Sequence, residues 1–299
     1  MNKARYYCPS ITVFDEDCNV DIEGCKKHWE FLIEKGISGI IVMGSAGEFW
    51  AIPADQKKAL IDAAVETINH RVPLIIGTGN HNYKDMIALS NYAIDKGADG
   101  IIIVGTTYFA PDAAGIEQYF GKAADQIHGD IYIYNFPGVT GYDVSPQITL
   151  NLLRKHKNIV GYKDTVRDMN HTRELLNTVL PEFPEFICFS GYDDNFAHNM
   201  LCGGRGGISG LSNLYPEIFA AWVDAANSSD AEAMYKLQRV VNRMCDLYAV
   251  HTNFMPMVKK GLQLRGLDIN DKCSEPFQRV TDTQTEAIKT IMADVEAMF

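Results

Sequence analysis

The sequence predicts a (β/α)8 barrel of the TIM type, an α/β fold, followed by a helical extension at the C-terminus. The chain has 299 residues, a length that α/β barrels often use as one domain. Eight short apolar runs rich in β-branched and aromatic residues recur along it, and most gaps between them are long enough for a crossover helix. The runs are continuous rather than alternating, which is typical of parallel strands buried on both faces.

The expected strands are these apolar runs. They lie at residues 11–14, 39–43, 73–77, 100–104, 131–135, 159–163, 186–190 and 206–210. Helices are expected between them, because capping residues flank the gaps. Asp21 precedes a helix that Gly36 closes. Pro53 and Asp112 each precede another helix, and Gly97 ends a further one. A doubly wound sheet is the alternative fold, but it leaves the eighth strand and the missing dinucleotide signature less well explained.

The pattern changes after the eighth run, where only helical segments follow from about Pro216 to the end. Breaks between these helices are expected near Ser228, near Asn253 and around Pro276. No linker rich in proline, glycine or serine separates the two parts. We therefore predict one structural unit, with the barrel at residues 1–215 and the helical extension packed on it at residues 216–299.

Composition and charge exclude several classes of function. Lys and Arg number 27 against 38 Asp and Glu, and the resulting charge of -11 would repel nucleic acid and anionic lipid. No segment approaches the roughly 20 apolar residues of a membrane helix, and the first residues lack the apolar stretch of a signal peptide. The seven cysteines are scattered without CxxC spacing, as in proteins of a reducing compartment. We expect a cytoplasmic enzyme that binds neither nucleic acid nor membranes.

Polar segments follow four of the expected strands. They are GSAGEF at 44–49, YNFPGVTG at 134–141, GYKDT at 161–165 and SGYDD at 190–194. The active sites of (β/α)8 barrels lie at the carboxyl ends of the strands. We therefore expect these four segments to contribute to one site at the same mouth of the barrel.

Lys163 follows the apolar sequence IVGY and is the strongest candidate for chemistry. An amine held at the end of an interior strand is desolvated, and desolvation favours its neutral form. A neutral amine can attack a ketone, and the resulting iminium ion accepts the electrons of an adjacent breaking bond. The alternative is structural, because Lys163 could pair with Asp164 or extend its charged end out of the barrel.

Two hydroxyl side chains are expected near that amine. Tyr134 ends a buried strand and could carry a proton to and from the imine and the substrate hydroxyl, with Ser45 as a relay. Either side chain could instead be a hydrogen-bonded core residue. The glycine-bracketed backbone at Ser45 and Ala46 could direct its amides at a carboxylate, or it could be only a tight turn leading into a helix.

Three further patterns indicate neither a cofactor nor a metal. GTGN at 77–80 lacks the third glycine of a dinucleotide loop. GGRGG at 203–207 precedes the eighth strand, which favours a packing turn over a phosphate site. The eight histidines include no HxxxH pair and no cluster with acidic residues, so we expect no metal and no other cofactor.

The four strand-end motifs, in this order, resemble the dihydrodipicolinate synthase and N-acetylneuraminate lyase superfamily over nearly the whole chain. The resemblance implies a pyruvate-type Schiff base on Lys163, proton transfer by Tyr134, and carboxylate binding by the backbone of Ser45 and Ala46. Members usually carry hydroxyl side chains at both turn positions, and Ala46 departs from that pattern. Tyr108 in TTYFAP matches a tyrosine that reaches into a neighbouring subunit's site, within homotetramers built as dimers of dimers.

Substrate choice depends on departures from the family pattern. Synthases of the lysine pathway typically read YNxPxRTG and use the arginine for a substrate carboxylate, whereas this chain has Val139 there. GYDD resembles the sugar-acid lyases, whose polar side chains accept hydrogen bonds from substrate hydroxyls, although one of the two carboxylates could instead cap a helix. The expected substrate-contacting residues at these strand ends are Thr165, Gly191, Asp193, Asp194 and Ile208.

YNFP, GYKDT and GYDD together look most like the aldolases that cleave 2-keto-3-deoxy sugar acids, of gluconate or galactonate type, to pyruvate and an aldehyde. We therefore expect a carbon–carbon lyase that uses a lysine Schiff base. Dihydrodipicolinate synthase and N-acetylneuraminate lyase are the alternatives within the same superfamily. A non-catalytic barrel that binds a 2-oxo acid is the alternative of another class.

Overall fold

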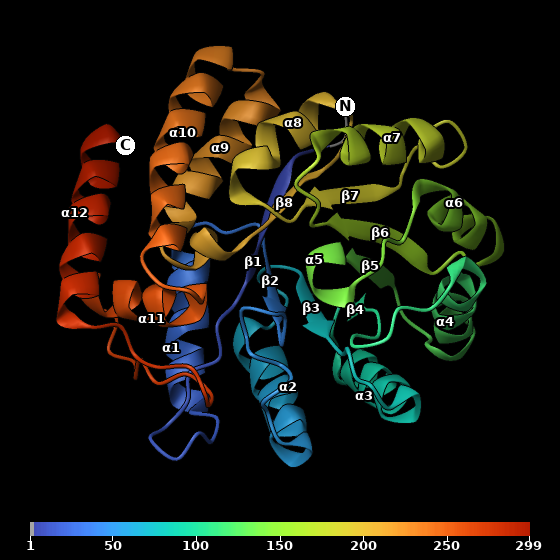
Figure 1. Cartoon of the computed structure of the whole chain (residues 1–299), viewed down its shortest axis with the longest axis horizontal. Coiled ribbons are helices and arrows are strands. Elements are labelled where there is room, and N and C mark those ends of the chain that lie inside the picture. The colour runs from blue at the N-terminus through green and yellow to red at the C-terminus, as the bar shows by residue number, and fades with distance from the viewer. Residues whose placement is uncertain (1–2) are drawn as a thin grey trace. The chain divides into compact units, whose positions relative to one another are not determined.

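The computed structural model describes residues 3–299. Eight strands follow one another in chain order around a closed parallel barrel, which confirms the predicted (β/α)8 fold. The strands are β1 (Arg5–Pro9), β2 (Gly39–Val42), β3 (Leu74–Gly77), β4 (Gly100–Val104), β5 (Ile131–Asn135), β6 (Ile159–Asp164), β7 (Ile187–Ser190) and β8 (Gly206–Ile208). Figure 1 shows β5, β6 and β7 side by side.

Helices occupy the segments between the strands, and their predicted caps are confirmed. The side chain of Asp21 accepts a hydrogen bond from the Gly24 amide at 3.0 Å, and that of Asp112 accepts one from the Gly115 amide at 2.8 Å. Gly97 ends α3 with a φ of 111°, which only glycine adopts at little cost. The helices up to β8 are α1 (Ile22–Glu34), α2 (Ala54–Ile68), α3 (Tyr83–Lys96), α4 (Ala113–Gln126), α5 (Pro137–Thr140), α6 (Pro146–Lys155), α7 (Met169–Val179) and α8 (Phe196–Leu201).

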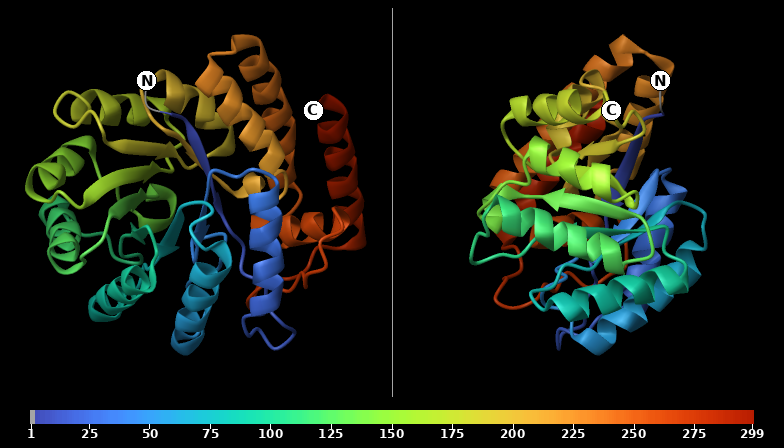
Figure 2. Two further views of the ribbon diagram at one scale, coloured as in Figure 1. Left: turned by 180° about the vertical axis from the view of Figure 1, so that it is seen from behind. Right: turned by 90° about the vertical axis from the view of Figure 1, so that its right-hand side faces the viewer.

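The residues after β8 are helical, as the sequence predicts. The helices are α9 (Pro216–Ser228), α10 (Ala231–Met244), α11 (Phe254–Leu264) and α12 (Asp282–Met298). Helix α9 packs on β1, where the ring centroids of Tyr6 and Phe219 lie 4.3 Å apart. Helices α10 and α12 contact each other and lie side by side in Figure 1 and in the left view of Figure 2. None of the helices in residues 3–299 has the length and apolar composition needed to cross a lipid bilayer.

The described chain forms two compact units. One contains residues 75–208, and with them β4 to β8. The other contains residues 4–74 and 209–299, and with them β1, β2 and the four C-terminal helices. The two-part description with a boundary near residue 215 stays a prediction.

The first strand lies at Arg5–Pro9, so its prediction at residues 11–14 is wrong. Those residues are buried, but their pairing is limited to an isolated bridge between Phe14 and Val20, and two of their amides contact side chains. Ile11 N–H donates to Asn213 Oδ1 at 3.0 Å, and Val13 N–H faces Cys25 Sγ at 3.3 Å. The apolar run therefore marks a buried loop, in which side chains satisfy the backbone.

Candidate functional site

Lys163 and Tyr134 are partners at the ends of two paired strands. Each is the next-to-last residue of its strand, and the two stand opposite each other in the register of β5 and β6. Both are buried, with 6% of each residue exposed. The Lys163 Nζ lies 4.2 Å from the centroid of the Tyr134 ring, close enough for a cation–π contact. The structure thus brings the predicted amine and phenol together.

Asp164 faces away from Lys163, because successive residues of a strand point to opposite sides. Its carboxylate is bound elsewhere: Thr172 Oγ1 donates to Oδ2 at 2.6 Å, and His171 Nδ1 lies 3.1 Å from the same oxygen. These contacts replace the alternative in which Lys163 forms a structural ion pair with its neighbour. The sequence analysis missed His171, since nothing in the pattern around it indicates a partner.

His171 lies between two carboxylates. Its Nδ1 is 3.0 Å from Oδ1 of Asp164, and its Nε2 is 3.1 Å from Oδ1 of Asp143. Asn135 Nδ2 donates to the same Asp143 oxygen at 2.7 Å. Burial alone would lower the pKa of His171, but the hydrogen bonds to Asp143 and Asp164 outweigh it and raise the pKa to about 10.

Thr165 is the first residue after β6 and lies two positions after Lys163. Its residue is 6% exposed, and its Oγ1 has no hydrogen-bond partner within residues 3–299. The hydroxyl packs on Gly191, where a Cβ atom would lie 1.8 Å from Oγ1. A glycine is therefore required there, and a buried hydroxyl is left with its hydrogen-bonding capacity for a ligand.

Asp193 and Asp194 follow β7 in the short 3₁₀ helix η1 (Asp193–Asn195). Asp193 is buried and Asp194 is exposed. Tyr192 and Asn195 occupy the N-cap positions of η1 and α8. Ile208, the last residue of β8, is fully buried. Substrate contacts by these residues stay predictions.

The GSAGE segment forms a series of turns, and α2 begins at Ala54, directly after Pro53 as the sequence predicts. Within the turns, Glu48 N–H donates to the Ser45 carbonyl oxygen at 3.1 Å. Ser45 is half-buried and Ala46 is buried. Carboxylate binding by this backbone stays a prediction.

Glu48 fixes these turns from behind through a fully buried ion pair with Lys259. Lys259 Nζ lies 2.7 Å from Glu48 Oε1, and both side chains are 0% exposed. The ammonium also donates to the Lys272 carbonyl oxygen at 2.7 Å and lies 4.7 Å from the centroid of the Phe14 ring. Ser274 donates to Glu48 Oε2 through its amide at 2.7 Å and its hydroxyl at 2.8 Å. The ammonium and the carboxylate of this buried pair therefore both have partners beyond each other, as buried charges require.

Tyr108 is 90% exposed and has a φ of 81°, an uncommon conformation for a residue other than glycine. Its ring meets that of Phe109 edge-on, with centroids 4.8 Å apart. Val139 occupies the position that holds an arginine in the pattern YNxPxRTG, and it is 54% exposed. The structure thus leaves an aromatic pair on the surface of a single chain.

A cation missed by the sequence analysis lies on the loop after β6. The guanidinium carbon of Arg167 is 5.7 Å from the centroid of the Tyr192 ring, on the loop after β7. No group of three or more His, Cys, Asp and Glu side chains within residues 3–299 is arranged to hold a metal ion.

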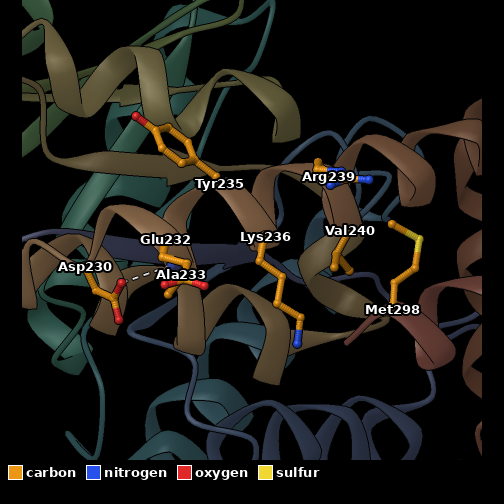
Figure 3. Close-up of a pocket in the computed structure, with 8 residues that line it drawn as sticks. All are labelled: Asp230, Glu232, Ala233, Tyr235, Lys236, Arg239, Val240 and Met298. Atoms are coloured by element: carbon orange, nitrogen blue, oxygen red, sulfur yellow. Dashed lines mark hydrogen bonds between the residues drawn. The ribbon is translucent and has the colours of Figure 1, made fainter.

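A surface hollow of about 670 Å³ lies on α10 and the end of α12, away from the predicted site residues in sequence. Figure 3 shows its lining, which consists of Asp230, Glu232, Ala233, Tyr235, Lys236, Arg239, Val240 and Met298. None of these residues belongs to a strand end, where a barrel enzyme holds its substrate.

The closed parallel barrel, with a buried lysine and tyrosine paired at its strand ends, defines the chain as a (β/α)8-barrel enzyme. The chain belongs to the dihydrodipicolinate synthetase family, whose model matches residues 3–295. The recognition made from the four motifs is therefore confirmed. Members of this family are lyases, and so is this chain.

The curated relatives carry different substrate names. The putative 2-dehydro-3-deoxy-D-gluconate aldolase YagE of Escherichia coli is 30% identical over 288 residues, which are 96% of this chain and 95% of the relative. The probable 2-dehydro-3-deoxy-D-pentonate aldolase YjhH of the same organism is 30% identical over 284 residues, 95% and 94% of the two chains. A 4-hydroxy-tetrahydrodipicolinate synthase of Kosmotoga olearia is 32% identical over 275 residues, 92% of each chain.

A crystal structure of Escherichia coli YagE in complex with pyruvate has a TM-score of 0.95 to this chain at 29% identity, and the match covers 99% of both chains. The similarity therefore includes the whole fold and not only the strand ends.

Proposed function

We propose that this chain is a class I aldolase that cleaves a 2-keto-3-deoxy sugar acid to pyruvate and an aldehyde. The observation that carries the proposal is the contact of Lys163 with Tyr134, a buried amine 4.2 Å from the centroid of a buried phenol ring at the ends of paired strands. A buried lysine amine is suited to attack a ketone, and a phenol beside it can move a proton.

The reaction begins when the Lys163 amine attacks the C2 ketone of the substrate and water is lost, which gives an iminium ion. Tyr134, with Ser45 as relay, removes the proton of the C4 hydroxyl. The C3–C4 bond then breaks, its electrons enter the iminium system as an enamine, and the aldehyde leaves. Protonation of the enamine at C3 and hydrolysis of the imine release pyruvate and restore the amine. The reverse direction is an aldol condensation.

The sugar-acid substrate is supported by the relatives YagE and YjhH, whose names are those of 2-dehydro-3-deoxy sugar acid aldolases. The unpartnered Thr165 hydroxyl provides a hydrogen-bonding group for a polyhydroxylated chain. Gly191, Asp193, Asp194 and Ile208 complete the proposed substrate contacts. The backbone of Ser45 and Ala46 is proposed to bind the substrate carboxylate.

A second copy of the chain completes the site in this proposal. Tyr108 and Phe109 are 90% and 79% exposed, and a surface aromatic pair of this kind is suited to pack against another subunit. We expect a homotetramer, a dimer of dimers, in which Tyr108 reaches the neighbouring site.

The decisive experiment traps the imine with borohydride in the presence of pyruvate. The wild-type protein should gain a covalent adduct on Lys163, located by peptide mass spectrometry, and Lys163→Ala should gain none. Lys155→Ala is the control, because Lys155 is an exposed residue paired with Glu117 and its loss should leave trapping intact. An unmodified wild-type mass would refute the mechanism.

The role of Tyr134 is tested by Tyr134→Phe, which keeps the ring and removes the hydroxyl. Turnover of the sugar acid should fall about 100- to 10,000-fold, the usual contribution of a general acid–base group, while pyruvate trapping persists. Tyr132→Phe, two residues earlier on β5, is the matched control and should be affected far less. Equal turnover of Tyr134→Phe and wild type would remove Tyr134 from the mechanism.

A 4-hydroxy-tetrahydrodipicolinate synthase is the second candidate function, favoured by the Kosmotoga relative and by Arg167. Arg167 could replace the arginine missing at Val139 as partner of a substrate carboxylate. A panel of sugar acids, together with pyruvate and aspartate semialdehyde, separates the candidates by product. Tight pyruvate binding with no product in either arm would instead indicate a binding protein.

A further inference from the structure

A chain of hydrogen bonds behind the proposed site joins the ends of β5 and β6. Asn135 follows Tyr134, and Asp164 follows Lys163, so each end of the chain is the residue next to a proposed catalytic group. Between these ends, Asn135 Nδ2 donates to Asp143 at 2.7 Å. His171 Nδ1 lies 3.1 Å from Asp164 Oδ2, and His171 Nε2 lies 3.2 Å from Asp143 Oδ2. Asn135 Oδ1 also accepts the Val144 amide at 3.0 Å, which fixes the orientation of the Asn135 side chain.

The geometry and the raised pKa of His171 favour an imidazolium. Each of its ring nitrogens lies within 3.2 Å of a carboxylate oxygen, and a neutral imidazole has only one N–H to donate. The side chain of His171 is 13% exposed, so water replaces little of this pairing. Two carboxylates and one imidazolium leave a net charge of -1 on the cluster.

Within residues 3–299, Tyr162 on β6 and Cys188 on β7 are further titratable groups that face these carboxylates. Tyr162 donates its hydroxyl to the Val144 carbonyl oxygen at 2.7 Å, and Cys188 is paired with Asn199. Burial raises the pKa of both groups well above the usual range, so both stay neutral. His171 is thus the group that balances the two carboxylates.

We propose that His171 is a positioning residue for imine formation, which neutralises Asp164 and holds the end of β6 so that the Lys163 amine reacts in its neutral form. The inference rests on the proposed role of Lys163. A carboxylate left unpaired beside an amine favours the ammonium, which cannot attack a ketone. The imidazolium removes most of that influence, and its link through Asp143 to Asn135 keeps the amine beside the phenol.

The test compares the pH dependence of pyruvate trapping by cyanoborohydride in full-length wild type and His171→Gln. Glutamine keeps a hydrogen-bonding group but lacks the charge. The pH of half-maximal trapping should rise by about one unit, which corresponds to a roughly tenfold lower trapping rate near neutral pH. Cyanoborohydride reduction itself depends on pH. Dividing the variant's trapping rate by the wild-type rate at each pH removes this dependence.

His156→Gln is the matched control, because the His156 side chain is 14% exposed and lies 3.3 Å from the Asp125 carboxylate. It should keep the wild-type midpoint. The double variant Asp164→Asn/His171→Gln removes the unbalanced carboxylate and should return the midpoint towards wild type. If His171 had only a structural role, His171→Gln and the double variant would lose stability. Their pH midpoints of trapping would not rise and then return in this way.

A folded His171→Gln protein with the wild-type midpoint would overturn the inference while leaving the aldolase proposal intact. Absence of any adduct on the wild-type protein would remove both. Should His171→Gln not fold, Asp143→Asn tests the same charge balance, because it makes the net charge of the cluster less negative instead of more negative. It removes one negative charge and should lower the midpoint, and an unchanged midpoint there would contradict the proposal.

Discussion

Two charge clusters lie next to predicted site segments, one at the Ser45 turns and one at the end of β6, and they are built differently. The cluster behind Ser45 pairs Glu48 with Lys259, both 0% exposed, and adds main-chain partners from residues 272 and 274. The cluster behind Lys163 uses His171, which is 13% exposed, between two side-chain carboxylates. The Glu48–Lys259 cluster is fully buried and bonded to the main chain, and we call it the sealed cluster. The His171 cluster consists of side chains and is partly exposed at Asp143, and we call it the titratable cluster.

The difference follows from what each cluster supports. The Ser45 turns need only a fixed shape, and a lysine with a carboxylate and a carbonyl partner provides it. The end of β6 carries the proposed amine, and the Asp164 carboxylate is the next residue along the strand. An imidazolium can balance two carboxylates at once there, because it donates from two opposite edges of one ring.

The largest expected effect breaks the sealed cluster. Glu48→Gln leaves the Lys259 ammonium buried without a carboxylate, and the free energy of unfolding should fall by about 3–5 kcal/mol. Urea denaturation followed by circular dichroism measures it. Glu16→Gln, at the exposed pair with Arg279, is the control and should change stability little.

The double variant Glu48→Gln/Lys259→Met sharpens this test. It removes both buried charges, so most of the lost stability should return, since apolar replacements of buried ion pairs are often neutral or stabilising. Stability equal to that of Glu48→Gln alone would show that the ammonium is not the cause of the loss.

The second effect concerns the titratable cluster and depends on pH. The pKa of His171 is raised from 6.5 to about 10 in the folded chain, so its contribution is complete below pH 6.5 and disappears as the pH rises towards 10. His171→Gln should cost about 2 kcal/mol in mildly acidic solution, through two hydrogen bonds between charged groups, and less in alkaline solution.

Urea denaturation of wild type and His171→Gln across that range measures this difference. The stability gap between the two proteins should narrow with rising pH. A His171→Gln gap that is constant or widens would contradict an imidazolium held by two carboxylates.

The smallest effects come from a matched pair of hydroxyl deletions. Ser274→Ala removes a 2.8 Å bond to Glu48, and Thr172→Val removes a 2.6 Å bond to Asp164. Each carboxylate keeps other partners, so each change should cost about 1 kcal/mol by urea denaturation. A much larger loss at only one site would show that its cluster depends on that hydroxyl more than its remaining contacts suggest.

The sequence predicted the strands that are buried on both faces. The runs at 100–104 and 131–135 match β4 and β5 to the residue, because such strands are continuous apolar segments. The same signal failed at 11–14, where burial occurs without strand pairing, and it missed Arg5–Pro9, whose first residue is charged. An apolar run therefore predicts burial. It becomes a strand only where a neighbouring strand can pair with it.

The sequence by itself predicted the fold and the family, because buried strands and strand-end motifs are local patterns of a few residues. It also predicted that Lys163 and Tyr134 lie at the same mouth of the barrel. Only the tertiary structure revealed the partners of Glu48 and His171. Lys259 is 211 positions from Glu48, and Asp143 is 28 positions from His171. No local pattern connects such residues, since they meet only after the chain has folded, and burial then makes each unpaired charge too costly to leave without a partner.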